Sequence, residues 1–242
     1  MTNTAIQLSR LSKAYPNSRG IHDLNLNVDQ GDIFGLLGPC GAGKTTAMKV
    51  ISGLIKPDSG DVNFFGSSIT DHYVDAIKQV GCMIDTTEPY PYLTANENLQ
   101  LIARFYPHVD QGRIDECLKI TGMIKYKHEK AKKYSLGMKQ RLGMATAILS
   151  RPKLLILDEP MNGLDFEGKL EIGRLMKRIS VEEGTTLFIS SHLIHDMEQT
   201  CTRIGVLYDG KLVNEDYTGN ILSNYSSLEK YFASEVDRHD RV

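Results

Sequence analysis

An eight-residue segment rich in glycine contains the residue types that hold phosphate. It reads Gly38-Pro39-Cys40-Gly41-Ala42-Gly43-Lys44-Thr45 and matches the pattern G-x-x-x-x-G-K-[ST]. Its glycines let backbone N–H groups turn toward an anion, and the N-terminus of a following helix adds partial positive charge. Lys44 is predicted to contact the β- and γ-phosphates of a nucleotide and Thr45 to ligate Mg²⁺. The segment therefore predicts a nucleoside triphosphate site.

The residues on either side of this segment suit that role. Asp32 to Leu37 is an apolar run typical of a buried strand, and Lys44 to Ser52 predicts a helix that ends near Gly53. The phosphate pattern requires this order of strand, loop and helix. The alternative, a glycine-rich turn with a surface lysine, is disfavoured by the same context.

Two adjacent carboxylates and a histidine follow other predicted strands. Four apolar residues, Leu154 to Leu157, precede Asp158 and Glu159, as in a central parallel strand covered on both faces. Ligands bind in open α/β sheets at the C-terminal ends of such strands. A further strand is predicted at Thr185 to Ser190, and His192 follows it by two residues. We therefore expect these polar side chains at the ligand-binding edge of a parallel sheet.

The remaining patterns predict both antiparallel strands and a helical insertion. Apolar and polar residues alternate, as in half-buried antiparallel strands, in Ile6 to Leu8 and in Leu24 to Val28. From Tyr92 to about Lys133 the apolar spacing is helical. Other strands are expected at Asp61–Gly66 and Val80–Ile84, an Asp-Gly hairpin at Ile204–Val213, helices from Ser135 to Leu149 and from Leu170 to Ile179, and a charged, mobile end at Ser234–Val242.

Composition excludes several classes of function. The 242 residues are 41% hydrophobic and 24% charged with a net charge of -2, so no overall basic field attracts nucleic acid. No apolar run approaches the roughly 18 residues that span a bilayer, and Met1 to Arg10 lacks the pattern of a signal peptide. The four cysteines show no paired spacing, which favours a reducing compartment over a zinc site or disulfides. Cys40, inside the phosphate loop, is either a small side chain without chemistry there or, because it lies near a helix N-terminus and Lys44, a reactive thiol.

Taken together, these motifs resemble the ATPase subunit of an ATP-binding cassette (ABC) transporter, from Tyr15 to Val213. The most diagnostic part is Tyr134-Ser135-Leu136-Gly137-Met138-Lys139-Gln140-Arg141, which looks like the signature sequence of that family. The guanine-reading N-K-x-D of GTPases is absent, as are the H-R-D and D-F-G motifs of protein kinases.

The resemblance implies a role for individual residues. Asp158 matches the aspartate that holds Mg²⁺, and Glu159 matches the carboxylate that polarises the attacking water. His192 looks like the switch histidine that senses the γ-phosphate, and Tyr15 like the aromatic ring that stacks on adenine. The segment Asn162 to Asp165 looks like the D-loop, which lies across a dimer interface in the family.

These assignments give three sets of expected site residues. The catalytic set is Glu159, His192 and Lys44. The set that binds ATP is Tyr15, Gly38, Pro39, Cys40, Gly41, Ala42, Gly43, Lys44, Thr45, Thr46, Ser135 and Gly137, where the last two face the nucleotide of a second subunit. The metal set, for Mg²⁺, is Thr45, Asp158 and Asp85.

The resemblance also implies the fold and its division. We expect an α/β fold with a P-loop NTPase (RecA-like) core, an antiparallel β subdomain and an inserted α-helical subdomain. One ABC ATPase domain would span residues 1–218, with the core at 1–88 and 152–218 and the helical subdomain at 89–151, followed by a short C-terminal tail at 219–242.

Within the family, the signature and the segment Tyr90 to Leu99 look most like exporters of antibiotics and antimicrobial peptides, including bacitracin-resistance and lantibiotic-immunity systems. This implies an ATP-hydrolysing subunit that powers a separate membrane permease. It would work as a homodimer or as a heterodimer with a second ATPase subunit, in the cytoplasm on the inner face of the cell membrane, and we expect no nucleic-acid partner.

Departures from the family pattern keep two alternatives open. Asp85 stands where the family usually has a glutamine, Leu136 and Met138 replace the more common glycine and glutamine of the signature, and Cys40 replaces a common asparagine. A nucleotide-gated binding protein with little hydrolysis is one alternative. A soluble ABC ATPase that acts outside transport is the other.

Overall fold

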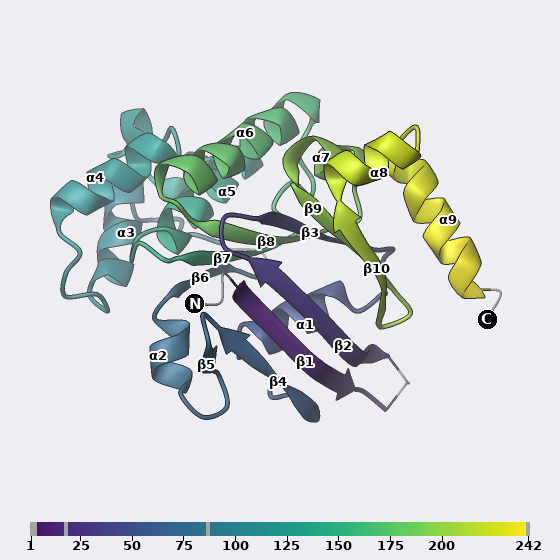
Figure 1. Cartoon of the computed structure of the whole chain (residues 1–242). Helices are drawn as coiled ribbons and strands as arrows, with labels where there is room; N and C mark the ends of the chain where they lie inside the picture. The colour runs from purple at the N-terminus through teal and green to yellow at the C-terminus, as the bar shows by residue number, and fades with distance from the viewer. Residues whose placement is uncertain (1–3, 17–18, 86–87, 241–242) are drawn as a thin grey trace.

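The computed structural model describes residues 4–16, 19–85 and 88–240, which fold into two sheets with helices on both faces of the larger one (Figure 1). The strands are β1 (Thr4–Ala14), β2 (Gly20–Asp29), β3 (Ile33–Leu37), β4 (Ser59–Phe64), β5 (Ser67–Ser68), β6 (Val80–Met83), β7 (Leu154–Asp158), β8 (Thr186–Ser191), β9 (Arg203–Tyr208) and β10 (Lys211–Tyr217). The helices are α1 (Lys44–Ile51), α2 (Tyr73–Ile77), α3 (Ala95–Ala103), α4 (Gln111–Ile120), α5 (Leu136–Ala147), α6 (Phe166–Glu182), α7 (Ile194–Thr200), α8 (Thr218–Asn224) and α9 (Leu228–Asp240), with short 3-10 turns at Ile124–Tyr126 and Ala131–Lys133.

The larger sheet has six strands in the order β10-β9-β3-β8-β7-β6. Every neighbouring pair from β9 to β6 is parallel, and β10 returns antiparallel to β9. The smaller sheet is antiparallel, in the order β2-β1-β4-β5. The predicted α/β fold with an added antiparallel sheet is confirmed.

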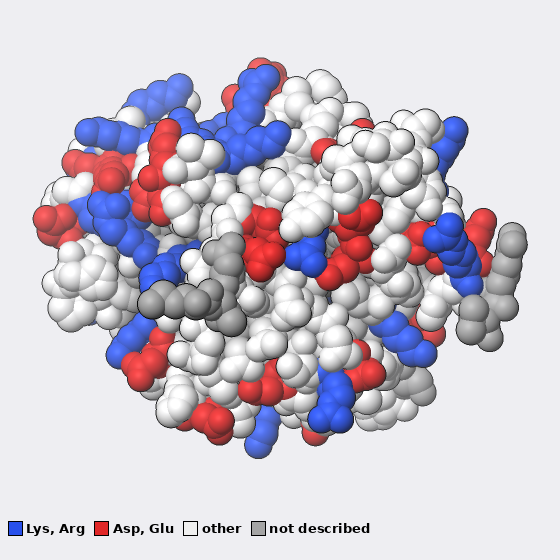
Figure 2. Space-filling model, viewed as in Figure 1, with Lys and Arg blue, Asp and Glu red and all other residues white. Residues whose placement is uncertain are grey.

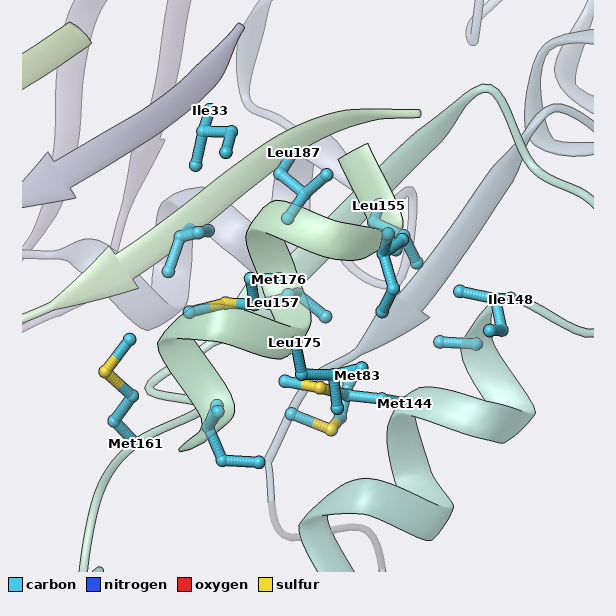
Figure 3. Packing of buried hydrophobic residues seen from close by; sticks show 14 of the residues in the cluster. Ile33, Met83, Met144, Ile148, Leu155, Leu157, Met161, Leu175, Met176 and Leu187 are labelled. Atoms are coloured by element: carbon cyan, nitrogen blue, oxygen red, sulfur yellow. The ribbon is translucent and has the colours of Figure 1, made fainter. Parts of the chain in front are cut away.

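The central strands are apolar because both of their faces are covered. All five residues of β7 are buried, and alternate side chains enter opposite cores. Leu155 and Leu157 pack with α5 and α6 in one core, together with Met144 and Met176, as Figure 3 shows. Leu154 and Ile156 enter the second core.

The second core fills the space between the two sheets. Helix α1 contacts β2 of the small sheet as well as β7 and β8 of the large one. Within this core the rings of Phe34 and Phe188, from the paired strands β3 and β8, stack with centroids 5.4 Å apart. The packing fixes the start of α1, and therefore the phosphate loop, against the large sheet.

Local signals place several elements correctly. The hairpin of β9 and β10 turns at Asp209 and Gly210, whose φ angles of 45° and 75° suit a type I′ turn. Helix α5 begins after Ser135, whose hydroxyl accepts a hydrogen bond from the N–H of Met138 at 3.3 Å. Among the described residues, no helix is long and apolar enough to cross a membrane.

The C-terminal end differs from its prediction. Instead of a mobile charged stretch from Ser234, the chain is helical in α9 as far as Asp240. Apolar residues spaced for one helical face, Leu228, Tyr231 and Phe232, pack against the core, and the charges lie around them. Residues 241–242 lie outside the described part, and the subdomain boundaries near residues 88 and 151 stay predictions.

Helix α3 begins with a reciprocal pair of hydrogen bonds. The N–H of Glu97 donates to the hydroxyl of Thr94 at 3.2 Å, and the N–H of Thr94 donates to the Glu97 carboxylate at 2.7 Å. Thr94→Ala is expected to lower the free energy of unfolding by about 1 kcal/mol. Chemical denaturation measures this change, and Thr94→Ser, which keeps the hydroxyl, is the control. Equal destabilisation by both variants would contradict the assignment.

Candidate active site

The phosphate loop joins the end of β3 to the start of α1, as the sequence predicts. Gly41 and Gly43 have φ angles of 87° and 104°, a region that favours glycine. At Gly43 a Cβ atom would lie 2.5 Å from the carbonyl oxygen of Gly20, so only glycine fits there. Close packing against β2 therefore shapes the loop.

Lys44 lies beneath this loop. Its ammonium group donates to the carbonyl oxygens of Gly38 at 2.8 Å and Pro39 at 3.2 Å, and it is 3.4 Å from a carboxylate oxygen of Glu159. Only 7% of the side chain is exposed. The alternative of a surface lysine is therefore wrong.

The carboxylates and the histidine meet where β7 and β8 end. Asp158 accepts a hydrogen bond from the hydroxyl of Ser190, and that hydroxyl also accepts from the N–H of Glu159 at 3.1 Å. Nδ1 of His192 lies 2.9 Å from a carboxylate oxygen of Glu159. Since a carboxylate oxygen accepts, Nδ1 of His192 carries the hydrogen of this bond.

The backbone at Glu159 is strained. Its φ angle is 47°, a left-handed conformation that costs of order 1–3 kcal/mol in a residue with a side chain. The hydrogen bonds from its N–H to Ser190 hold this conformation. Strain of this kind concentrates at functional sites, and here it directs Glu159 toward Lys44 and His192.

A cleft of about 580 Å³ runs along the phosphate loop. Tyr15, with 38% of its surface exposed, lines this cleft together with Thr45 and Thr46. Arg19 also lines the cleft but was not predicted. The sequence signal that could have identified Arg19 is its positive charge, placed between the aromatic turn at Tyr15 and the start of β2. Residues 17–18 of this turn lie outside the described part.

Asp85 follows β6 and pairs with α1. Its carboxylate lies 2.8 Å from the ammonium group of Lys49, and its φ angle is 59°. The hydrogen bond that Lys49 donates to Asp85 raises the pKa of Lys49, and the charge of Asp158 contributes to the same shift. Because Lys49 also interacts with Asp158, Asp85 can change the electrostatic potential at the site through Lys49.

A second hollow surrounds the start of α5. It has a volume of about 680 Å³ and is lined by Ser135, Gly137 and the residues Gly163 to Asp165. None of the described residues lines both this hollow and the cleft along the phosphate loop. Within the described part of one chain, the predicted nucleotide ligands therefore form two separate groups.

The fold, the phosphate loop and the carboxylate pair define a P-loop ATPase of the cassette type. The chain matches the ABC transporter family over residues 21–162 and belongs to that family. As a member it is an ATP-binding subunit of an ABC transporter and an ATPase, as the sequence predicts.

Relatives with transport names share much of the sequence. The chain is 43% identical to the bacitracin transport ATP-binding protein BcrA of Bacillus licheniformis over 216 residues, which cover 88% of this chain and 70% of the relative. It is 33% identical to the lantibiotic transport ATP-binding protein SrtF of Streptococcus pyogenes over 232 residues, which cover 96% and 97% of the two chains.

Solved structures of cassettes have the same fold. An ATP-binding subunit of an ABC transporter superimposes with a TM-score of 0.81 at 26% identity, covering 96% of this chain and 100% of that one. The cassette MJ0796, in a dimeric post-hydrolysis state bound to ADP and Pi, gives a TM-score of 0.77 at 27% identity and covers 88% and 98% of the two chains.

Proposed function

We propose that the chain closes as a dimer on ATP at the inner face of the cell membrane and powers an exporter for antibiotics or antimicrobial peptides. The observation that carries the catalytic part is the meeting of Lys44, Glu159 and His192 at the ends of three neighbouring strands. Phosphoryl transfer needs positioned charges of this kind more than covalent chemistry.

In this proposal the phosphates replace contacts within the protein. Lys44 exchanges its bonds to loop carbonyl oxygens for phosphate oxygens, and the loop residues Gly38 to Thr46 supply N–H donors. Glu159 orients a water and accepts its proton as the general base. His192 holds the Glu159 carboxylate through Nδ1, and it would contact the γ-phosphate by donating from an Nε2–H, since phosphate oxygens accept.

The donors present fit Mg²⁺. Among the described residues no group of three His, Cys, Asp or Glu side chains forms a metal site by itself. Magnesium usually takes one or two protein oxygens and completes its shell with phosphates and water, which suits the hydroxyl of Thr45 and the carboxylate of Asp158. Bound there, it would neutralise phosphate charge. Asp85 would contribute from the outer shell, since its carboxylate is paired with Lys49.

The two separate groups of nucleotide ligands support a dimer. Ser135 and Gly137 line a different hollow from the phosphate loop, so they do not share the nucleotide of their own loop. In the proposed dimer they contact the nucleotide that is bound to the second chain. The dimeric state of MJ0796 is in keeping with this arrangement. The partner would be a second copy or another ATPase subunit.

Turnover at several protein concentrations tests the dimer, with light scattering on the same samples. We expect ATP hydrolysis to rise cooperatively with concentration as dimers form. Hydrolysis strictly proportional to protein at all concentrations, by a chain that stays monomeric, would exclude the dimer.

The names of the relatives and the surface of the helical region support the transporter part of the proposal. BcrA and SrtF are named for transport of bacitracin and lantibiotics. Tyr90 and Tyr92, in the segment Tyr90 to Leu99, are 62% and 74% exposed, and they are available to a permease. Purified permease should bind the chain and raise its turnover. Absence of both effects would exclude this permease as the partner.

The face of the molecule in Figure 2 gives no support to a nucleic-acid partner. On the face in Figure 2, basic and acidic side chains are interspersed and no continuous basic field covers it. This distribution agrees with the net charge of -2. A nucleic-acid site would normally show a basic patch or stripe.

Tyr15 is proposed to stack on adenine. Tyr15→Ala is expected to weaken ATP binding about tenfold, within the range of about 1–3 kcal/mol for stacking a base on an aromatic ring. Titration with a fluorescent ATP analogue measures the dissociation constant. Tyr15→Phe keeps the ring and should bind like the parent, and a loss of affinity in that variant would point to the hydroxyl instead.

Cys40 is proposed to be the thiol that reacts at the site. It is exposed in the phosphate loop, whereas burial raises the pKa of Cys117 and Cys201 to about 12. Cys82 is exposed as well, and Cys82→Ala should leave the inactivation unchanged. A thiol-directed alkylating agent should inactivate the protein, and ATP should protect it. Equal inactivation of Cys40→Ala would assign the effect to another residue.

A further inference from the structure

A buried ion pair joins α4 to the end of α6. The guanidinium group of Arg113 contacts both carboxylate oxygens of Glu183, with Nη1–Oε1 at 3.2 Å and Nη2–Oε2 at 2.9 Å. The two side chains are only 6% and 8% exposed. Such two-point contacts fix the orientation of both partners as well as their distance.

The same guanidinium group also caps α5. Its Nε donates to the carbonyl oxygen of Leu149 at 3.2 Å, and its Nη2 donates to the carbonyl oxygen of Ile148. Ile148 is the C-cap of α5 and Leu149 follows it, so Arg113 binds where a helix leaves acceptors unpaired and favours positive charge. Arg113 therefore fastens the C-terminal ends of α5 and α6 to each other.

A second link joins α5 and α6 closer to their N-terminal ends than the Arg113 contact does. Arg141 of α5 lies 2.6 Å from Glu171 of α6. Leu136, the first residue of α5, packs so closely on Gly163, which precedes α6, that a Cβ atom on Gly163 would lie 3.0 Å from the leucine side chain. Arg141 precedes Ile148 by seven residues and Glu171 precedes Glu183 by twelve, so the two links lie about 10 Å apart along α5 and about 18 Å apart along α6.

We propose that Arg113 and Glu183 are positioning residues that make α5 and α6 one rigid body. Contact of Ser135 and Gly137 with the nucleotide of the second chain then displaces α6 together with α5. Because α6 begins immediately after the segment Asn162 to Asp165, which follows Glu159, the displacement reaches the catalytic carboxylate. This inference rests on the dimer proposed above.

A buried ion pair such as Arg113–Glu183 is better suited to positioning two helices than to stabilising the fold. Replacing such a pair by apolar residues of similar volume is often neutral for stability, whereas removal of one partner leaves an unpaired buried charge. The double variant Arg113→Met/Glu183→Met therefore separates stabilisation of the fold from positioning of the helices. It is expected to fold, but it lacks the two-point contact. Glu183→Gln, which keeps the shape, is the single variant.

The test uses the full chain in the Glu159→Gln background, so that dimers formed with ATP persist. Relative to that parent, the double variant should need about tenfold more protein to reach half-maximal dimer, while the ATP affinity of the monomer changes less than about twofold. Lys78→Met, which breaks the exposed pair of Lys78 with Asp75, is the matched control and should behave like the parent.

Hydrogen exchange supplies a readout that a structural role would not change. At protein concentrations that saturate the dimer, ATP should slow amide exchange at residues 135–139 and 162–168 of the parent. In the double variant the protection at 135–139 should remain and that at 162–168 should be lost. Glu183→Gln should show the same separation in weaker form.

The possible outcomes distinguish the two proposals. A double variant that dimerises and is protected like the parent would overturn the coupling by Arg113 and Glu183 alone. Loss of monomer ATP binding in a folded double variant would also overturn it, because the pair would then act on the nucleotide site directly. A parent that forms no dimer with ATP would overturn the proposed dimer, and the coupling with it.

Discussion

Glu159→Gln is expected to lower ATP turnover by about 10²–10⁴-fold, the usual contribution of a general base, with ATP binding retained. Glutamine keeps the size of the side chain and accepts a hydrogen bond from Nδ1 of His192, now 2.9 Å from the carboxylate. It does not accept a proton from water. The strained backbone is held by Ser190 through the N–H, which the substitution leaves intact.

Steady-state turnover and equilibrium binding of ATP, measured on the same preparation, separate the two effects. Glu229→Gln removes an exposed carboxylate of α9 far along the chain and should retain full turnover. A Glu159→Gln protein that hydrolyses ATP at the parental rate would show that another group activates the water. That result would favour a mechanism in which the groups around the phosphates orient the attacking water without a carboxylate base.

Lys44→Met is expected to weaken ATP binding by about 10- to 100-fold, since hydrogen bonds to charged groups contribute about 1.5–3 kcal/mol. The ammonium group is buried beneath the loop and is preorganised there by the carbonyl oxygens of Gly38 and Pro39. Methionine is apolar and similar in length, so the cavity stays filled while every donor is lost.

Isothermal titration calorimetry measures this affinity. The control is Lys56→Met, which removes an exposed lysine beyond the end of α1. Lys44→Arg should not restore binding, because a planar guanidinium group needs more room than a side chain that is 7% exposed leaves. Parental affinity in Lys44→Met would assign phosphate binding to the loop N–H groups alone.

The elements predicted from sequence were those whose signals are local. The phosphate loop needs glycines and a lysine at fixed spacing, and the buried strand β7 needs a short apolar run, so both could be recognised from a few residues. Helix α9 is harder to predict because many charged residues surround the apolar spacing of Leu228, Tyr231 and Phe232, and that spacing becomes decisive only when the core is present to cover it.

The amino-acid sequence alone determined the family, the α/β class and the identities of Lys44, Glu159 and His192, because each stands in a short pattern with a chemical reason for its spacing. The tertiary structure decided how these groups meet. Glu159 and His192 are 33 residues apart, and the register of β7 with β8 brings them to 2.9 Å. The contact of Arg113 with Glu183 spans 70 residues. Contacts of such separation depend on how helices and strands pack, and no local pattern specifies that packing.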